Sequence, residues 1–483
     1  MKISSRMRTS PDKDDLEMAH LDHMQTTFSD DEKKRIVRRV DGYLVTMCGL
    51  TACVSLMDRT NISSAAIAGM NEALDLNVEN RYSIVVLVFF ITYVVGQVPA
   101  TATVRKFGAK WFLSTLVLLW GATMIAFGFL HTWYQMTALR LLLGLFEGGF
   151  FPGIIFLLST WYVRFELQKR YAGYYILGMV ASAFSGILAF GLTHMQGVGG
   201  LDGWRWIFII EGILTCLVGF LCYPFLLDFP DYEMKSIHRF SPLSREECMF
   251  MMCRVQEDRG DSDTEPFDWS KFFGPALDLK IWAFALIFFA NTAVCYSLAY
   301  FLPIILRQSM GFSTGASQCL VAPPYVLAAL VMIVESWAGD RYHVRGPFII
   351  FNSLVAICGL ALMGYGPSDV AQYIGCFLVT AGGNSSIPSV LTYQANNIRG
   401  QWGRAFSSAT IVGFGGIGGI LGGVVFRTQD APRYLPGIWT SIGLMILVIG
   451  LVVVMSVMFH VKNKKADRGE IILEGQRAFR YTL

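Results

Sequence analysis

Long apolar runs separated by short polar stretches dominate the chain from residue 42 onward. Each run holds roughly 20 residues or more, the length that a helix needs to cross the ~30 Å hydrocarbon core of a bilayer. The pattern therefore predicts an all-α membrane protein with twelve transmembrane helices. The predicted spans are 42–68, 82–104, 111–130, 133–162, 171–192, 206–227, 279–306, 316–338, 347–364, 370–393, 405–426 and 435–460.

Polar stretches divide these spans into two sets of six. Residues 1–41 form a predicted cytosolic tail, which begins without the apolar stretch of a signal peptide. The long interior stretch 228–278 is a predicted cytosolic loop, and 461–483 is a predicted cytosolic C-terminal tail. Residues 42–227 and 279–460 then form an N-terminal and a C-terminal six-helix bundle.

Composition excludes several classes of protein. Hydrophobic residues make up 54% of the chain and charged residues only 16%, whereas an average soluble domain is about 25% charged. The net charge of +3 comes without a basic stripe, so we expect no nucleic-acid partner. The sequence contains no P-loop, nucleophile elbow or metal-spaced histidine cluster, so we expect no enzymatic activity, no cofactor and no metal.

Positive charge is concentrated in alternate connections between the spans. Under the positive-inside rule, this asymmetry places both termini and the central loop in the cytoplasm. The plasma membrane is the expected location, and we expect a monomer embedded in the lipid bilayer. The positive clusters are Lys33, Lys34, Arg35, Arg38 and Arg39; Arg105, Lys106 and Lys110; Arg164, Lys169 and Arg170; Arg341 and Arg345; Arg399 and Arg404; and Lys462, Lys464 and Lys465.

The two halves share a pattern of small residues. The fourth span contains Glu147-Gly148-Gly149-Phe150-Phe151-Pro152, and the tenth contains Ala381-Gly382-Gly383-Asn384 followed by Pro388. Matching Gly and Pro positions in two halves are typical of transporters whose bundles rock about a midplane site. The sequence therefore predicts two pseudo-symmetric bundles. For the glycines of the eleventh span, between Gly413 and Gly423, close helix packing is the expected role.

Ionisable residues inside the spans are the main candidates for function, because each costs roughly 2.5 to 3.5 kcal/mol at the centre of a membrane helix. Asp58 and Arg59 lie in the first span, Arg140 and Glu147 in the fourth. At 1.5 Å per residue, Arg59 and Arg140 are expected near one level in the outer half, with Glu147 about 10 Å nearer the cytoplasm. Glu211 lies just inside the outer end of the sixth span.

Two interpretations of these four charges remain open. They form either a self-neutralising network that fixes helix packing, or a site in which Arg59 and Arg140 bind an anion and Asp58 and Glu147 carry protons. A guanidinium group suits a carboxylate because it donates two parallel hydrogen bonds. Protonation of an acid releases an arginine, so the same charges would couple anion binding to proton uptake.

Polar residues of the second half are candidates for the remaining contacts to a substrate. Tyr296 and Tyr300 lie in the seventh span, and Asn384 and Tyr393 lie in the tenth. Asn397 follows the tenth span directly. Helix packing is the alternative role for each of these side chains.

Several motifs resemble those of the major facilitator superfamily. Residues 339–346, Gly-Asp-Arg-Tyr-His-Val-Arg-Gly, resemble its cytoplasmic loop between helices eight and nine, whereas the copy at 103–110 lacks the Asp. The segments 57–62, 139–152 and 203–212 resemble the anion:cation symporter branch, and Phe479-Arg480-Tyr481 resembles the tail of its fungal allantoate permease-like group. The eleventh span departs from many relatives, because glycines stand where those relatives have an Asn.

The resemblance implies proton-coupled uptake of a small organic anion, such as a carboxylate vitamin or a ureide, by alternating access. It also implies proton coupling and anion binding at Asp58, Arg59, Arg140 and Glu147. A proton-antiport exporter is one alternative, weakened because the fifth span contains no proline. A nutrient receptor that transports nothing is an alternative of another class.

Overall fold

The computed structural model describes residues 28–78, 80–235, 242–259, 269–342, 344–399, 401–427, 430–431, 433–474 and 479–483. The regular secondary structure of these residues is helical, and no strand forms among them. Eleven helices of the described chain are long and apolar enough to cross a membrane. The predicted second span lies on α5 (Arg81–Phe107), whose apolar part is Arg81–Gln97. The prediction of an all-α membrane protein is confirmed.

The N-terminal half begins with one long, interrupted helix. Helix α2 (Asp30–Val40) passes through a π-helical turn at Asp41–Val45 into α3 (Thr46–Ala65), and a second π-helical turn, Ala66–Met70, leads to α4 (Asn71–Ala73). Ser29 and Glu32 form a capping box that begins α2. The remaining helices of this half are α5, α6 (Ala109–Phe127), α7 (Trp133–Gly148), α8 (Phe150–Trp161), α9 (Arg164–Thr193) and α10 (Gly203–Phe225).

The connection between the halves and the second half are also helical. The connection contains α11 (Pro230–Lys235), α12 (Arg245–Arg259) and α13 (Trp269–Phe273). The second half consists of α14 (Leu279–Gln308), α15 (Thr314–Cys319), α16 (Ala322–Tyr342), α17 (Gly346–Tyr365), α18 (Asp369–Asn397), α19 (Gln401–Val425) and α20 (Leu435–Asp467).

Two predicted spans are each divided into two helices. The span 133–162 is broken at Gly149, where α7 ends and α8 begins. The span 316–338 is broken between α15 and α16, where Pro323 and Pro324 occupy the first turn of the new helix. Proline is tolerated in a first turn because its missing N–H would have no partner there. In α18, by contrast, Pro388 lies inside a continuous helix.

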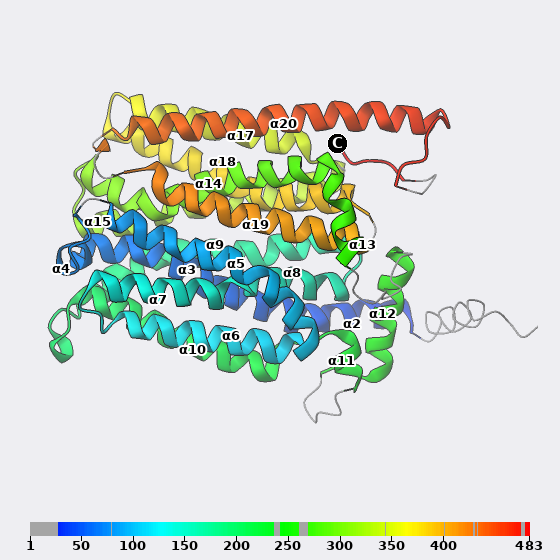
Figure 1. The fold of residues 1–483 in the computed structure, drawn as a ribbon, viewed down its shortest axis with the longest axis horizontal. Coiled ribbons are helices and arrows are strands. Elements are labelled where there is room, and N and C mark those ends of the chain that lie inside the picture. The colour runs from blue at the N-terminus through cyan, green and yellow to red at the C-terminus, as the bar shows by residue number, and fades with distance from the viewer. Residues whose placement is uncertain are drawn as a thin grey trace, which may run out of the picture.

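The long helices run side by side along the longest axis of the molecule (Figure 1). One end carries α12, α13 and residues 479–483, and we call it the tail side. The opposite end carries α4 and α15, and we call it the far side. Helix α3 therefore runs from the tail side to the far side, whereas α7 returns from the far side to the tail side.

Helices of the two halves pack against each other in the middle of the molecule. Helix α5 lies against α19, α9 against α16, and α3 against α14. The contact between α5 and α19 depends on small residues: Gly419 and Gly423 of α19 pack directly on Phe90 and Val86 of α5. Glycine permits this approach because a Cβ atom at either position would overlap the facing side chain.

Hydrogen bonds also join the two halves on the far side. The hydroxyl groups of Tyr82 and Ser63 donate to the backbone carbonyls of Tyr300 and Ala299, each at 3.2 Å. Gln318 donates to the carbonyl of Ser64 at 3.2 Å, and Arg307 donates to the carbonyl of Ile67. The far-side ends of α3 and α5 are thus held against the C-terminal half.

Candidate functional site

A cavity lies between the two halves, and side chains from both line it. Helices α3, α5, α7, α8 and α9 contribute from the first half, and α14, α16, α18 and α19 from the second. Arg59 and Glu147 are the charged residues of this lining among the described residues. Its polar and aromatic members are Ser55, Thr60, Ser182, Thr292 and Asn384, with Tyr93, Tyr174, Tyr175, Tyr296, Tyr325, Phe150, Phe151 and Phe288.

Arg59 of α3 and Glu147 of α7 form a buried ion pair in this lining. The Nη2 and Nε atoms of Arg59 lie 2.7 Å and 3.1 Å from Glu147 Oε1. Ser55, one turn earlier on α3, donates to the same oxygen at 2.6 Å. Three hydrogen bonds therefore converge on one carboxylate oxygen, and Oε2 accepts none from the described residues.

Tyrosine rings hold the other side of the Arg59 guanidinium group. Its Nη1 atom donates to the hydroxyl of Tyr296 on α14. Its central carbon lies 5.2 Å from the ring centroid of Tyr296 and 5.4 Å from that of Tyr93, within range of a cation–π interaction. Arg59 thus contacts both halves of the protein at once, through Glu147 in one half and Tyr296 in the other.

The two arginines that the sequence suggested as one anion site do not share the cavity. Arg140 is 3% exposed and does not belong to the lining, and its central carbon lies 5.4 Å from the ring centroid of Phe127. Its Nε atom is buried without a hydrogen-bond partner in the described part of the chain. Arg140 remains close enough to Tyr82, Tyr300, Glu147 and Asp58 to interact with them electrostatically.

The direction of helical side chains explains this separation. A Cα–Cβ bond tilts toward the N-terminus of its helix. Arg59 on α3 therefore extends toward the tail side, where Glu147 lies. Arg140 belongs to a helix of the opposite direction, so it extends toward the far side and away from Arg59.

Asp58 occupies a different environment from its neighbour Arg59. It is 2% exposed, and its Oδ2 atom accepts a hydrogen bond from Trp120 Nε1 of α6 at 2.5 Å. Asn61, one turn later on α3, donates to Asp58 Oδ1 at 3.5 Å and also to Glu211 of α10. Asp58 therefore faces α6 and α10 and does not line the cavity.

Two of the five residues suggested from the second half line the cavity. Tyr296 contacts Arg59, and Asn384 lines the wall contributed by α18. Tyr300 lies one turn beyond Tyr296, with the two rings stacked at a centroid distance of 6.2 Å, and it is outside the lining.

Tyr393 and Asn397 have another role in the structure, because they lie on the tail side of α18. Tyr393 packs edge-on against Phe284 and Phe459. Asn397 binds the C-terminal segment: its Oδ1 atom accepts from the amide of Thr482 at 2.8 Å, and its Nδ2 atom donates to the carbonyl of Thr482 at 3.2 Å. The structure does not bring these two residues to the cavity.

Sequence reasoning missed most of the tyrosines that line the cavity. Tyr93, Tyr174, Tyr175 and Tyr325 line the cavity. Tyr93, Tyr174 and Tyr175 lie inside α5 and α9, away from the helix ends where tyrosine is usually enriched, whereas Tyr325 lies in the first turn of α16. For Tyr93 and Tyr325, the position in the interior of a predicted apolar span was the available signal.

Comparison with known proteins gives the family. Residues 48–423 match the model of the Major Facilitator Superfamily. An uncharacterised transporter of Schizosaccharomyces pombe is 30% identical over 451 residues, which cover 93% of this chain and 91% of the relative. The high-affinity nicotinic acid transporter of Saccharomyces cerevisiae is 29% identical over 458 residues, which cover 92% and 82% of the two chains.

Solved structures share the fold. The proton:xylose symporter XylE, bound to 6-bromo-6-deoxy-D-glucose, matches with a TM-score of 0.66 at 14% identity, over 85% of this chain and 94% of that one. The human organic anion transporter MFSD10 matches with a TM-score of 0.61 at 15% identity, over 86% and 99%. The family model covers most of the membrane-spanning part, and the chain therefore belongs to the Major Facilitator Superfamily of transporters.

Proposed function

We propose that this chain is a secondary active transporter that takes up a small organic anion together with protons, by alternating access of its two bundles. The observation that carries the proposal is the Arg59–Glu147 pair in the cavity wall. An arginine cannot give up its proton, so it is a permanent cation for the substrate. The carboxylate that neutralises it is the group that can be protonated.

Competition for Arg59 couples the two solutes. With Glu147 ionised, its Oε1 atom occupies the Nε and Nη2 donors of Arg59, the pair of donors that a carboxylate substrate needs. Protonation of Glu147 weakens that pair and leaves the cavity with a net positive charge. Binding of a monoanion then restores neutrality. Joint binding of the anion and the proton is therefore favoured in a cavity of low dielectric constant.

The aromatic wall favours a substrate with a flat apolar body. Five tyrosines surround the cavity, and aromatic faces stack on planar groups. The nicotinic acid transporter of S. cerevisiae, to which this chain is similar, takes a substrate of this chemistry. We therefore propose a small carboxylate as the substrate class, with nicotinic acid as the first candidate to test.

The remaining residues of the proposed site would differ in whether they contact the substrate directly. Tyr296 and Asn384 would contact the substrate from the C-terminal half, and Arg140 would supply positive potential from outside the wall. We propose that Asp58 acts with Glu147 in proton coupling. We also propose that the protein lies in the plasma membrane. Both termini would face the cytoplasm, because the tail side carries the positive clusters that flank the spans.

The test is uptake by protein reconstituted in liposomes. A panel of vitamin, ureide and dicarboxylic anions is offered as competitors while internal pH is followed with a dye. We expect an inward pH gradient, acidic outside, to drive accumulation of a carboxylate and internal acidification. Uptake that ignores the gradient would contradict symport, whereas efflux driven by inward proton flow would indicate an antiporter.

A single substitution tests the coupling residue. We expect Glu147→Gln to lower pH-driven accumulation while counterflow exchange of substrate persists, because glutamine keeps the shape but cannot take the proton. The matched control is Glu72→Gln on the exposed helix α4, which should accumulate substrate like the wild type. Accumulation by Glu147→Gln equal to that of the wild type would show that Glu147 does not carry a coupling proton.

A further inference from the structure

A second cluster of buried polar groups lies behind the cavity wall, between α3, α6 and α10. It comprises Asp58, Asn61, Trp120 and Glu211. None of the four lines the cavity. Asp58 and Glu211 are each only 2% exposed, and the side-chain amide nitrogen of Asn61 donates to both.

The charges around this cluster do not balance when every acid is ionised. Three buried acids, Asp58, Glu147 and Glu211, are present with the buried arginines Arg59 of α3 and Arg140 of α7. The buried Arg205 of α10 is paired with Asp202 and donates to the carbonyl of Gly128. Arg59 is already committed to Glu147. Arg140 alone remains for Asp58 and Glu211, and among the described residues it forms an ion pair with neither. An unpaired carboxylate inside a membrane protein is costly, so the cluster is one proton short of neutrality.

Unused acceptors in the cluster point the same way. Asn61 Oδ1 and Glu211 Oε1 are both buried and have no hydrogen-bond partner among the described residues. A buried acceptor without a donor is unfavourable, because it has lost the hydrogen bonds that water would have given it. A proton on Glu211 would convert one carboxylate oxygen into a donor, which is the group that this cluster lacks.

We propose that Asp58 and Glu211 bind one proton between them, through the bridging amide of Asn61, and that this proton is exchanged during transport separately from the proton on Glu147. The proposal rests on the proposed function for the exchange step. It adds Glu211 as a proton-holding residue and Asn61 as a positioning residue. While the proton is bound, Arg140 is the nearby cation that balances the one negative charge remaining on the pair.

The surroundings of the pair supply few other charges. Helix α3 contributes Arg59, which faces the cavity, and α7 contributes Arg140 and Glu147. Beyond Lys110, α6 carries no charged residue, and it contributes Trp120 as a donor. Residues 171–193 of α9 contain no charged residue or histidine; of their tyrosines, Tyr174 and Tyr175 line the cavity and Tyr171 does not. The π-helical turn Ala66–Met70 contains no titratable side chain.

The position of the pair on α3 suggests how it would respond to transport. Asp58 and Arg59 are consecutive, so their side chains diverge by about 100° on the same helix. A movement of α3 that releases Arg59 from Glu147 also moves Asp58 relative to Trp120 and Glu211. A movement of α3 on substrate binding would therefore change the surroundings of both proton sites.

The first test counts protons per anion in reconstituted liposomes, from the membrane potential at which substrate flux reverses. We expect Glu211→Gln to lower the number of protons by one relative to the wild type, and Glu211→Asp to restore it. Asp58→Asn should have the same effect as Glu211→Gln. The control is Glu335→Gln, a buried acid of the other half that accepts from Asn352 at 2.8 Å, and it should keep the wild-type number.

The outcomes separate this proposal from the proposed function. A wild-type number of protons in Glu211→Gln overturns the shared proton and leaves symport intact. Wild-type protein without pH-dependent flux overturns symport, and the shared proton is then tested by infrared spectroscopy of the carboxylic acid C=O band. Glu211→Gln and Asp58→Asn should each remove the same band, and Glu147→Gln should not. Where Glu211→Gln does not fold, Glu211→Asp and Asn61→Ala are measured instead, and an unchanged band in Asn61→Ala excludes the bridge.

Discussion

Arg59 and Glu147 belong to antiparallel helices, and their side chains meet because each helix directs them to the same depth in the cavity wall. The Nη2–Oε1 distance of 2.7 Å, together with the contact of Arg59 to Tyr296, makes this guanidinium group a link between the two halves inside the cavity wall. A substrate carboxylate that binds Arg59 must displace Glu147. On the proposed mechanism, the group that binds substrate is therefore also one of the contacts between the two halves.

We expect Arg59→Lys to raise the KM for anion uptake by about tenfold or more, although the charge is kept. Lysine cannot donate two parallel hydrogen bonds or stack flat between Tyr93 and Tyr296. The measurement is initial-rate uptake at limiting substrate. Arg81→Lys is the matched control, because Arg81 lies at the far-side end of α5 against Trp133 and outside the cavity. Normal uptake by Arg59→Lys would remove Arg59 as the substrate ligand.

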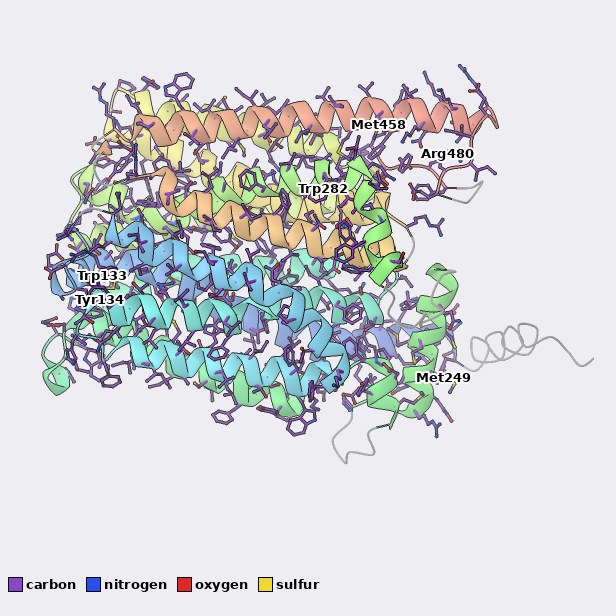
Figure 2. The ribbon with its side chains drawn as sticks, in the orientation of Figure 1. Trp133, Tyr134, Met249, Trp282, Met458 and Arg480 are labelled. Atoms are coloured by element: carbon purple, nitrogen blue, oxygen red, sulfur yellow. The ribbon has the colours of Figure 1, made fainter. Side chains whose placement is uncertain are left out.

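Tyr296→Phe tests the contact between the bundles with the ring retained. A hydrogen bond to a charged group is worth about 1.5 to 3 kcal/mol, which corresponds to roughly 10- to 100-fold in an equilibrium constant. We expect the transport rate to change within this range while the cation–π contact persists. The control is Tyr134→Phe, whose side chain is exposed near Trp133 at the far side (Figure 2). An unchanged rate in Tyr296→Phe would show that this hydroxyl does not bias the cycle.

The sequence predicted the helices better than it predicted the site. Apolar run length alone located the spans, because a lipid-exposed backbone must satisfy its hydrogen bonds as helix. Depth estimated from rise per residue placed Arg59 beside Arg140, whereas the structure pairs Arg59 with Glu147. The estimate used Cα positions, and a long side chain that tilts toward the N-terminus of its helix displaces its charge along the helix axis.

The role of Asn397 was beyond sequence reasoning for a different reason. Its partner Thr482 lies 85 residues later in the chain, and no local sequence pattern predicts that contact. Polarity near a membrane helix end is compatible with a substrate contact, a cap or a docked segment. Three-dimensional proximity alone decides among them.

We expect Asn397→Ala to loosen the C-terminal segment without changing the KM for substrate. The substitution removes two hydrogen bonds to Thr482, worth about 1 kcal/mol each. Hydrogen exchange at the Thr482 amide, followed by mass spectrometry, should accelerate by roughly tenfold or more. Asn396→Ala is the matched control, since the neighbouring side chain forms no hydrogen bond among the described residues. Equal exchange in both variants would contradict the anchoring role.

Docking of the C-terminal segment should also depend on pH through Glu474. Its Oε1 atom accepts from Lys280 at 2.5 Å and from Tyr481 at 2.6 Å. Burial alone would raise the pKa of Glu474, but the hydrogen bonds from Lys280 and Tyr481 and the Lys280 charge outweigh it and lower that pKa below the ordinary 4.5. A carboxyl group with a lowered pKa stabilises the docked state at pH values above its ordinary pKa, and this stabilisation is lost as the pH falls through the lowered pKa.

We expect hydrogen exchange at Tyr481 and Thr482, corrected for the intrinsic pH dependence, to increase on acidification below 4.5 in the wild type. Glu474→Gln should show fast exchange already at neutral pH and no acid step, whereas Glu470→Gln, at an exposed site, should behave like the wild type. An acid step that survives in Glu474→Gln would assign the pH dependence to another group.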